Sequence, residues 1–217
     1  MRALPFTTSA DVAAALPDTR AHLRRGGLLA YPTETVYGLG SRAETGAVAR
    51  LAAFKGRAEG KPFLLLVAGR RMAEAQGLVF TAAADTLANA FWPGPLTLVL
   101  RGGEGRLPDA LRGPEGGIAV RHTSHPGMAT LIAALGYPVT STSANRPGTP
   151  PAPGAAAVLE WFAPGVRDGT LLVLDGGVLG NVPPSTVVDC TTPEPRMVRE
   201  GAIPRAELRR KAGRHAP

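Results

Sequence analysis

Three cations lie within the segment 55–61 (KGRAEGK), between a helical pattern and an apolar run. Lys55, Arg57 and Lys61 are interspersed with two glycines, so their ammonium and guanidinium groups could converge on one oligoanion such as a triphosphate. Lys211 is the only other lysine of the chain, which sets this segment apart. A solvated basic turn would have the same composition, so the charge alone leaves both interpretations open.

A second polar segment, 140–145 (TSTSAN), carries four hydroxyl groups and one amide at the end of a predicted strand. Such short side chains donate and accept hydrogen bonds with little bulk, as expected where a polar ligand is enclosed. A Ser/Thr turn followed by a helix cap would use the same residues. Ser185, before an apolar strand, and Arg199, after a short Met-Val strand, are weaker signals of the same kind.

Common templates for phosphate, cofactor and metal sites do not fit. The residue after Lys61 is proline instead of Ser or Thr, which excludes a P-loop. The segment 38–43 (GLGSRA) fits G-x-G-x-x-A, but no predicted strand directly precedes it, which argues against a dinucleotide site. His122 and His125 lack a cysteine partner and a third ligand, so we predict no metal site. The chain also lacks the nucleophile motifs of covalent hydrolases.

Strand-like and helical patterns alternate along the chain, which favours an α/β fold. The spacings between residues 96 and 121 and after residue 170 suit hairpins or loops. We therefore expect a single domain with a twisted mixed sheet, both parallel and antiparallel, flanked by helices. The predicted strands are 27–31, 63–67, 96–100, 117–121, 138–142, 170–174 and 186–189. The predicted helices are 18–25, 46–54, 82–91, 127–135 and 155–162.

The chain of 217 residues is 44% hydrophobic, which suffices for one domain with a sizeable core. We assign residues 1–204 to this domain and 205–217 to a basic C-terminal tail. The tail contains five cations and one acidic residue, so it carries more than half of the net charge of +7. Because charged tails are most often solvated, the basic composition says little about the folded body.

The longest apolar run near the middle of the chain, 63–68, is far shorter than the roughly 18 residues of a membrane span. Residues 1–11 include a proline, three hydroxyl residues and an acid in place of the apolar core of a signal peptide. Cys190 is the only cysteine, which excludes an internal disulfide and suits a reducing compartment. We therefore expect a cytoplasmic protein without a membrane partner.

The segment 31–40 (YPTETVYGLG) combines a strand that ends in proline, an acid between two threonines, and a Tyr-Gly-Leu-Gly turn. It resembles the signature of the YrdC-like family of threonylcarbamoyl-AMP synthases. Further matches follow in the family's order, so the chain resembles the short, single-domain form of the family, with its open groove and catalytic domain. They are 55–57 (KGR), 91–97 (FWPGPLT), 120–121 (VR), 143–145 (SAN), 184–189 (PSTVVD) and 198–201 (VREG).

The resemblance implies a nucleotidyltransferase that joins L-threonine, bicarbonate and ATP into threonylcarbamoyl-adenylate and pyrophosphate. Mg²⁺ would accompany the ATP, and no organic cofactor is expected. A threonylcarbamoyl transferase complex would then pass the group to an adenosine beside the anticodon of certain tRNAs, and RNA binding is a further expectation. Because charge develops on phosphoryl oxygens in such a reaction, cations matter more than a nucleophile.

The family's functional positions map onto three sets of residues in this sequence. The basic and polar tetrad around the phosphates corresponds to Lys55, Arg57, Ser143 and Asn145. The ATP-binding set corresponds to Arg57, Lys61, Ser143, Asn145 and Arg199. The threonine-binding set corresponds to Thr35, Arg121, Ser141 and Ser185, of which Arg121 suits the carboxylate. The family implies no metal site built from protein ligands.

Three positions depart from the family's pattern. Thr123 stands where relatives usually carry proline, and Pro147 replaces a serine. Leu66 lies where many relatives place a histidine near threonine. These departures bear more on the threonine side of the site than on the nucleotide side.

Two alternative functions remain open. A carbamoyl-adenylate-forming relative would share the fold, but such domains usually belong to longer chains with zinc-finger segments, which one cysteine cannot build. An RNA-binding YrdC-like module without ATP turnover would suit the net charge of +7. However, aromatic residues make up only 5% of the chain, which leaves little for base stacking.

Overall fold

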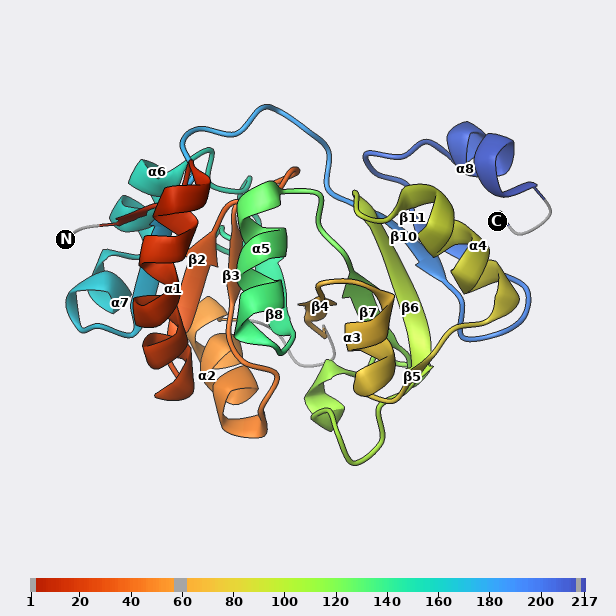
Figure 1. Ribbon diagram of the computed structural model, residues 1–217, viewed down its shortest axis with the longest axis horizontal. Coiled ribbons are helices and arrows are strands. Elements are labelled where there is room, and N and C mark those ends of the chain that lie inside the picture. The colour runs from red at the N-terminus through yellow and green to blue at the C-terminus, as the bar shows by residue number, and fades with distance from the viewer. Residues whose placement is uncertain (1–2, 57–61, 214–215) are drawn as a thin grey trace.

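One twisted sheet runs through the computed structural model, which describes residues 3–56, 62–213 and 216–217 (Figure 1). Over these residues the strand order is β1-β9-β2-β3-β8-β4-β7-β6-β10-β11, and β5 pairs with β6 outside this path. The strands are β1 (Leu4–Pro5), β2 (Leu28–Tyr31), β3 (Gly38–Gly40), β4 (Leu64–Leu66), β5 (Leu78–Val79), β6 (Leu96–Gly102), β7 (Ile118–Arg121), β8 (Val139–Ser143), β9 (Leu171–Asp175), β10 (Thr186–Asp189) and β11 (Arg196–Arg199).

The sheet contains both parallel and antiparallel pairs. Strand β9 is parallel to β1 and β2, β4 is parallel to β7, and β6 is parallel to β10. Strand β3 is antiparallel to β2 and β8, and the pairs β4–β8, β6–β7 and β10–β11 are also antiparallel. The mixed, helix-flanked sheet confirms the predicted α/β fold class.

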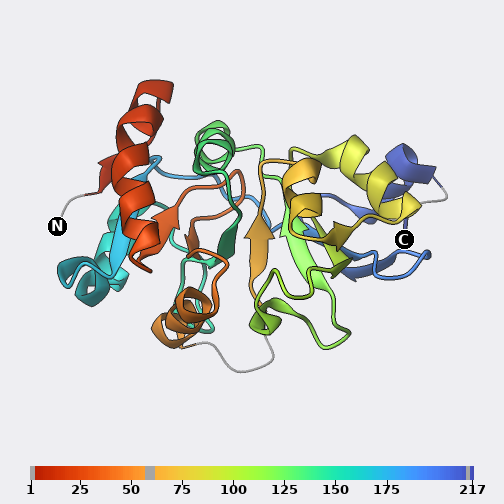
Figure 2. The ribbon, with the colours of Figure 1, turned by 60° about the horizontal axis from the view of Figure 1, so that its bottom comes forward.

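Helices cover both faces of the sheet. Figure 2 shows α1 and α5 on one face and α2 on the opposite face. None of the helices that the structure describes has both the length and the apolar composition needed to cross a bilayer. The helices are α1 (Ser9–Arg24), α2 (Thr45–Lys55), α3 (Arg70–Ala75), α4 (Ala82–Phe91), α5 (Pro126–Leu135), α6 (Ala155–Trp161), α7 (Ala163–Arg167) and α8 (Arg205–Ala212), with a 3-10 turn, η1 (Asp109–Leu111).

Both faces of β2 are buried, which explains its unbroken apolar sequence. Leu28 and Ala30 belong to the larger hydrophobic cluster, which includes the buried face of α2. Leu29 and Tyr31 belong to the second cluster, with residues of α1 and α5. Because successive side chains of a strand point to opposite faces, one short segment contributes to two core layers.

Helix α1 begins at Ser9 and is therefore longer than the predicted helix 18–25. A capping box starts it: the Thr8 hydroxyl accepts from the Asp11 N–H (3.1 Å), and the Asp11 carboxylate accepts from the Thr8 N–H (2.9 Å). Pro17 lies inside the helix, where proline is unfavourable. The helix continues through Pro17 because one of its faces is buried against α5 and the sheet.

The Tyr-Gly-Leu-Gly segment, predicted as a turn, instead contains strand β3 in the middle of the sheet. A Cβ atom on Gly40 would lie 1.9 Å from the carbonyl oxygen of Thr140, and one on Gly38 would lie 2.8 Å from the Tyr31 ring. The Tyr31 hydroxyl donates to the same Thr140 carbonyl (2.9 Å). These glycines therefore allow the strands and the Tyr31 ring to pack closely, and this packing explains them without a dinucleotide site.

Helix α8 corrects the expectation that residues 205–217 form a solvated tail. Leu208 is fully buried and Ala212 is nearly so, and both belong to the larger hydrophobic cluster. The helix packs on α4, where the Lys211 ammonium lies 4.9 Å from the centre of the Phe91 ring. Helix α8 thus carries its cations beside a buried apolar contact with the core. The division of the chain at residue 204 stays a prediction.

Replacing Gly40 with alanine should destabilise the fold, because the new methyl group would collide with the backbone of β8. We expect Gly40→Ala to lower the free energy of unfolding by about 1–3 kcal/mol in urea titrations. Gly46→Ala is the matched control, since nothing lies near that position in the first turn of α2. It should raise the free energy of unfolding by about 0.5–1 kcal/mol. Equal effects of the two substitutions would contradict the packing argument.

Truncating Leu208 should show that α8 is part of the folded core. We expect Leu208→Ala to lower the free energy of unfolding by about 2–5 kcal/mol, as for other buried leucines. Arg210, whose side chain is 70% exposed on the same helix, supplies the control, and Arg210→Ala should change stability by less than about 0.5 kcal/mol. A Leu208→Ala protein as stable as the control would mean that α8 is not held against α4 in solution.

Candidate functional site

One cavity of about 470 Å³ lies among β3, β4, β6, β7, β8 and β10 and the connection from β2 to β3. Its volume is in the range of small-molecule sites. Hydroxyl, amide and guanidinium groups line it, and its described lining contains neither a carboxylate nor an aromatic ring. The lining residues are Thr33, Thr35, Val36, Gly38, Pro62, Leu64, Thr97, Ala119, Arg121, Ser141, Thr142, Ser143, Asn145, Pro151, Pro184, Ser185, Val187 and Arg199.

Strand pairing places polar side chains from distant segments on one side of the sheet. Thr97 on β6 is the cross-strand partner of Arg121 on β7, and Ser143 on β8 is the partner of Gly38 on β3. Directly opposite residues project from the same face of a sheet. Ser141 precedes Ser143 by two residues and shares its face. The register of the sheet, rather than proximity in sequence, therefore assembles the lining.

Arg121 is the last residue of β7 and lines the cavity although it is only 4% exposed. Its Nη1 and Nη2 atoms donate to the Thr35 hydroxyl at 3.2 and 3.1 Å. The Thr35 hydroxyl lies 3.1 Å from that of Thr33, which donates to the Val36 carbonyl (2.7 Å) and so shapes the loop. Arg121 Nε is buried and has no hydrogen-bond partner within the described part of the chain. Arg121 thus combines a place in the cavity lining with a donor that the described residues leave unpaired.

Glu34, on the loop between β2 and β3, forms an ion pair with Arg121. Its Oε1 atom lies 2.8 Å from Arg121 Nη2, which makes an ion pair but not a hydrogen bond. Its Oε2 atom accepts from the Thr123 hydroxyl. Burial would raise the pKa of Glu34, but Arg121 and the hydrogen bond from Thr123 outweigh this and lower that pKa. Burial lowers the pKa values of His122 and His125, which Glu34 offsets in part. The carboxylate is therefore the charged partner of Arg121.

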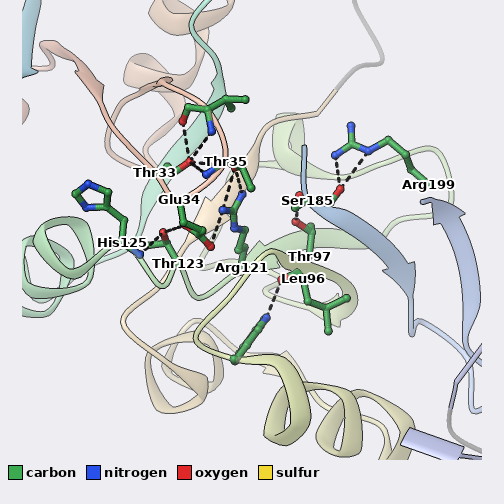
Figure 3. A network of polar contacts seen from close by, with 12 residues as sticks. Thr33, Glu34, Thr35, Leu96, Thr97, Arg121, Thr123, His125, Ser185 and Arg199 are labelled. Carbon is green, nitrogen blue, oxygen red and sulfur yellow. Dashed lines mark hydrogen bonds and ion pairs between the residues drawn. The ribbon is translucent and has the colours of Figure 1, made fainter. Parts of the chain in front are cut away.

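A second polar group surrounds Ser185, on the other side of Arg121 from Glu34 (Figure 3). The hydroxyl oxygens of Ser185 and Thr97 are 2.8 Å apart, and both residues are almost fully buried. Arg199 donates to the Ser185 carbonyl from Nε (3.3 Å) and Nη2 (2.8 Å). Burial lowers the pKa of Arg199, and the positive charge of Arg121 lowers it further. Two guanidinium groups therefore face one cavity.

Lys55 reaches the loop that follows β8 from the last position of α2. It is 7% exposed, and its ammonium donates to the carbonyl oxygen of Ser143 (2.7 Å) and to the backbone and side-chain oxygens of Asn145. The Ser143 hydroxyl also donates to the Asn145 amide oxygen (2.6 Å). Lys55, Ser143 and Asn145 therefore form one hydrogen-bonded unit at the edge of the cavity.

The structure brings together most of the residues that the sequence predicts for the site. Lys55 contacts the 143–145 loop and lines an adjoining pocket of about 380 Å³ with Asn145. Arg57 and Lys61 lie outside the described residues. The predicted residues that line the cavity itself are Thr35, Arg121, Ser141, Ser143, Asn145, Ser185 and Arg199.

Sequence reasoning left several polar residues in and around this cavity unassigned, among them Glu34, Thr97 and Thr123. Glu34 and Thr97 lie inside the segments that carry the family resemblance, so an acid between two threonines and the last residue of FWPGPLT were the available signals. The only signal at Thr123 is its difference from the proline that relatives usually carry there. Neither spacing nor composition reveals that Glu34 meets Arg121, because that contact depends on the pairing of strands far apart in sequence.

The arrangement suits an anionic ligand. Guanidinium groups bind carboxylates and phosphates through paired N–H donors, and the hydroxyl groups of the lining can donate to the same oxygens. Within the ranges that the structure describes, no group of three or more His, Cys, Asp or Glu residues could hold a metal ion. The site therefore offers charge and hydrogen bonds from the chain's own side chains.

Comparisons with known proteins agree with this fold. A threonylcarbamoyl-AMP synthase of Chromohalobacter salexigens is 40% identical over 189 residues, which are 85% of this chain and 97% of that protein. The structure of P. abyssi Sua5 complexed with L-threonine has a TM-score of 0.85 at 32% identity, over 99% of this chain but only 62% of that longer one. E. coli YciO has a TM-score of 0.74 at 28% identity, over 87% of this chain and 89% of that chain.

The family match covers most of the chain. Residues 21–201 match the Sua5/YciO/YrdC family, whose description is "Telomere recombination". This range includes every residue that lines the cavity. The protein belongs to the Sua5/YciO/YrdC family.

Proposed function

We propose that this protein is a threonylcarbamoyl-AMP synthase, which forms threonylcarbamoyl-adenylate and pyrophosphate from L-threonine, bicarbonate and ATP. The observation that carries the proposal is one cavity that holds Arg121, Arg199 and the 143–145 loop, on a fold shared with a Sua5 structure in complex with L-threonine. The 40% identity to a threonylcarbamoyl-AMP synthase over nearly its whole length supports the same activity.

Arg121 would bind the carboxylate of threonine. A guanidinium matches the geometry of a carboxylate through two parallel N–H donors. Thr35, Ser141 and Ser185 line the same cavity and would bind the remaining polar groups of the amino acid. Leu66 is buried in the core and does not line the cavity, so this departing position would not contact threonine.

The nucleotide end would comprise Lys55, Ser143, Asn145 and Arg199. These residues supply two cations, a hydroxyl and an amide to the region where phosphates would lie. Apolar residues of the lining, including Pro62, Pro151 and Pro184, would face the less polar parts of the nucleotide. Arg57 and Lys61 complete this set on the strength of the family resemblance alone.

The proposed reaction needs no nucleophile from the protein. The amine of threonine combines with bicarbonate to give a carbamate and water, and a carbamate oxygen then attacks the α-phosphorus of ATP as pyrophosphate leaves. Negative charge grows on the phosphoryl oxygens in the transition state, and fixed cations lower its energy. Holding the carbamate in line with the leaving group makes the attack effectively intramolecular.

Mg²⁺ would enter with ATP. The described lining has no carboxylate, and the Asn145 side-chain oxygen already accepts from Lys55 and from the Ser143 hydroxyl, so the Ser143 hydroxyl oxygen is the candidate protein ligand. Mg²⁺ retains several waters and binds substrate phosphates, so it needs few ligands from the protein. When bound, the ion would supply further neutralisation of charge on the leaving pyrophosphate.

The product would pass to a threonylcarbamoyl transferase complex that modifies the adenosine beside the anticodon of tRNA. This role assigns the protein to the cytoplasm, where bicarbonate, ATP and tRNA meet. An RNA-binding module without turnover gains little support from the site, because the described lining contains no aromatic ring on which a base could stack. The transient contacts with tRNA and with the transferase rest on the family resemblance.

The proposed function predicts threonine-dependent release of pyrophosphate. Purified protein given ATP, Mg²⁺, bicarbonate and L-threonine should release pyrophosphate and form an adenylate that mass spectrometry identifies as threonylcarbamoyl-AMP. Omitting threonine or bicarbonate, or chelating Mg²⁺ with EDTA, should stop both signals. Pyrophosphate release that is the same with and without threonine would refute the proposal.

Lys55→Ala should reduce adenylate formation, because it removes a cation next to the proposed phosphate site. We expect kcat to fall about 10²–10³-fold, as for the loss of one preorganised donor. The substitution also leaves buried oxygens of the 143–145 loop without their donor, so stability should fall by about 1–3 kcal/mol.

Steady-state pyrophosphate assays and thermal unfolding would measure the two effects of Lys55→Ala. Lys211→Ala is the matched control, since Lys211 lies on α8 and not in the cavity lining. It should leave kcat unchanged. Wild-type turnover in Lys55→Ala would remove Lys55 from the catalytic set.

A further inference from the structure

A carboxylate lies behind Arg121 without lining the cavity. Thr33 and Thr35 line the cavity, whereas Glu34, between them, does not, and the Glu34 side chain is only 18% exposed. The carboxylate lies 2.8 Å from Arg121 Nη2. Figure 3 shows the side chains of Glu34 and Thr123 together on one side of Arg121, with Thr97 and Ser185 on the other. Glu34 therefore forms a supporting layer behind the guanidinium.

Thr123 fixes the direction of this carboxylate. Its hydroxyl oxygen accepts from the His125 N–H (3.2 Å), and its hydroxyl hydrogen is donated to Glu34 Oε2. His125 is the N-cap of α5, so the hydroxyl is attached to the start of a helix. Thr123 is fully buried, which shields the hydrogen bond from water.

This support matters because Arg121 is a long side chain that must hold one orientation. A paired contact with a carboxylate requires both N–H donors of the guanidinium fork to point the same way. Thr35 contributes only a neutral oxygen, while Glu34 supplies the opposite charge that a buried cation needs. A guanidinium that is already held in place loses less conformational freedom when its ligand binds.

Glu34 does not take the place of a substrate carboxylate. It contacts the guanidinium from outside the cavity lining, and Thr123 restrains its other oxygen. Arg121 meanwhile faces the cavity, with its Nε lacking a hydrogen-bond partner among the described residues. The ion pair and a bound substrate carboxylate can therefore exist together, on different sides of the same guanidinium.

We propose that Glu34 and Thr123 are positioning residues, which orient Arg121 to receive the carboxylate of the amino-acid substrate. The inference rests on the proposed function, which makes Arg121 the carboxylate-binding group. In this proposal, Glu34 and Thr123 affect the binding of the amino acid and do not affect the binding of the nucleotide.

The test measures KM for threonine and KM for ATP separately, in pyrophosphate assays of the whole protein. Glu34→Gln removes the charge and keeps the shape, and Thr123→Val removes the hydroxyl that restrains Glu34. We expect each to raise the threonine KM about tenfold, the upper range for ordering one side chain, with the ATP KM unchanged. Thr123→Ser keeps the hydroxyl and should restore the wild-type threonine KM. Glu74→Gln, which breaks an exposed ion pair on α3, is the control for loss of one carboxylate and should change neither constant.

Each result decides for or against the inference. An unchanged threonine KM in Glu34→Gln and Thr123→Val would overturn it, as would equal rises in both KM values, which indicate general damage to the fold. A lower threonine KM in Glu34→Gln would mean that Glu34 competes with the substrate for Arg121, which also overturns it. If Glu34→Gln unfolds, the comparison of Thr123→Val with Thr123→Ser decides the question. Wild-type protein without threonine-dependent turnover would instead refute the proposed function, a distinguishable outcome.

Discussion

A positive charge buried at the end of β7 is the constraint on which the site depends. Arg121 is 4% exposed, and a guanidinium removed from water is stable only with partners that replace its hydration. Thr35 supplies an oxygen acceptor and Glu34 supplies the opposite charge, while Thr123 keeps that charge in place. The loop between β2 and β3, the end of β7 and the start of α5 are thereby tied to one side chain. The rest of the cavity is arranged around a cation whose orientation these elements determine.

The order of strands explains how six distant segments come to share one cavity. The central strands run β3-β8-β4-β7-β6-β10, so neighbours in space come from the beginning, the middle and the end of the chain. Strands β6, β7 and β8 contribute polar side chains to the lining, as Thr97 does opposite Arg121, while β3, β4 and β10 contribute Gly38, Leu64 and Val187. Lys55 then joins from a helix, through its bonds to the loop after β8. Such a site requires the whole sheet, because removing one strand would separate the residues on either side of it.

Local signals predict the parts of this fold that depend on local physics. The apolar run of β2 has the composition of a buried strand, and the polar segment that ends β8 has a composition that suits an enclosed polar surface. Sequence reasoning failed where tertiary packing overrides a local preference. Gly38 and Gly40 look like turn residues, but they are glycines because Tyr31 and β8 leave no room for a Cβ. Pro17 is unfavourable inside a helix and Leu208 lies in a highly charged segment, yet the packing around each determines its structure.

The partners of the two arginines differ between the two ends of the cavity in a way that suits the two proposed substrates. At the proposed nucleotide end, Arg199 donates to a neutral oxygen, the Ser185 carbonyl. A neutral partner fixes a cation without cancelling its charge, so the positive charge of this guanidinium is preserved for a highly charged triphosphate. Arg121 is paired with the carboxylate of Glu34, which cancels most of its charge at longer range. Threonine carries little net charge, so at that end the contact depends on oriented hydrogen bonds more than on the long-range field. The same cavity can therefore attract one ligand by charge and select the other by geometry.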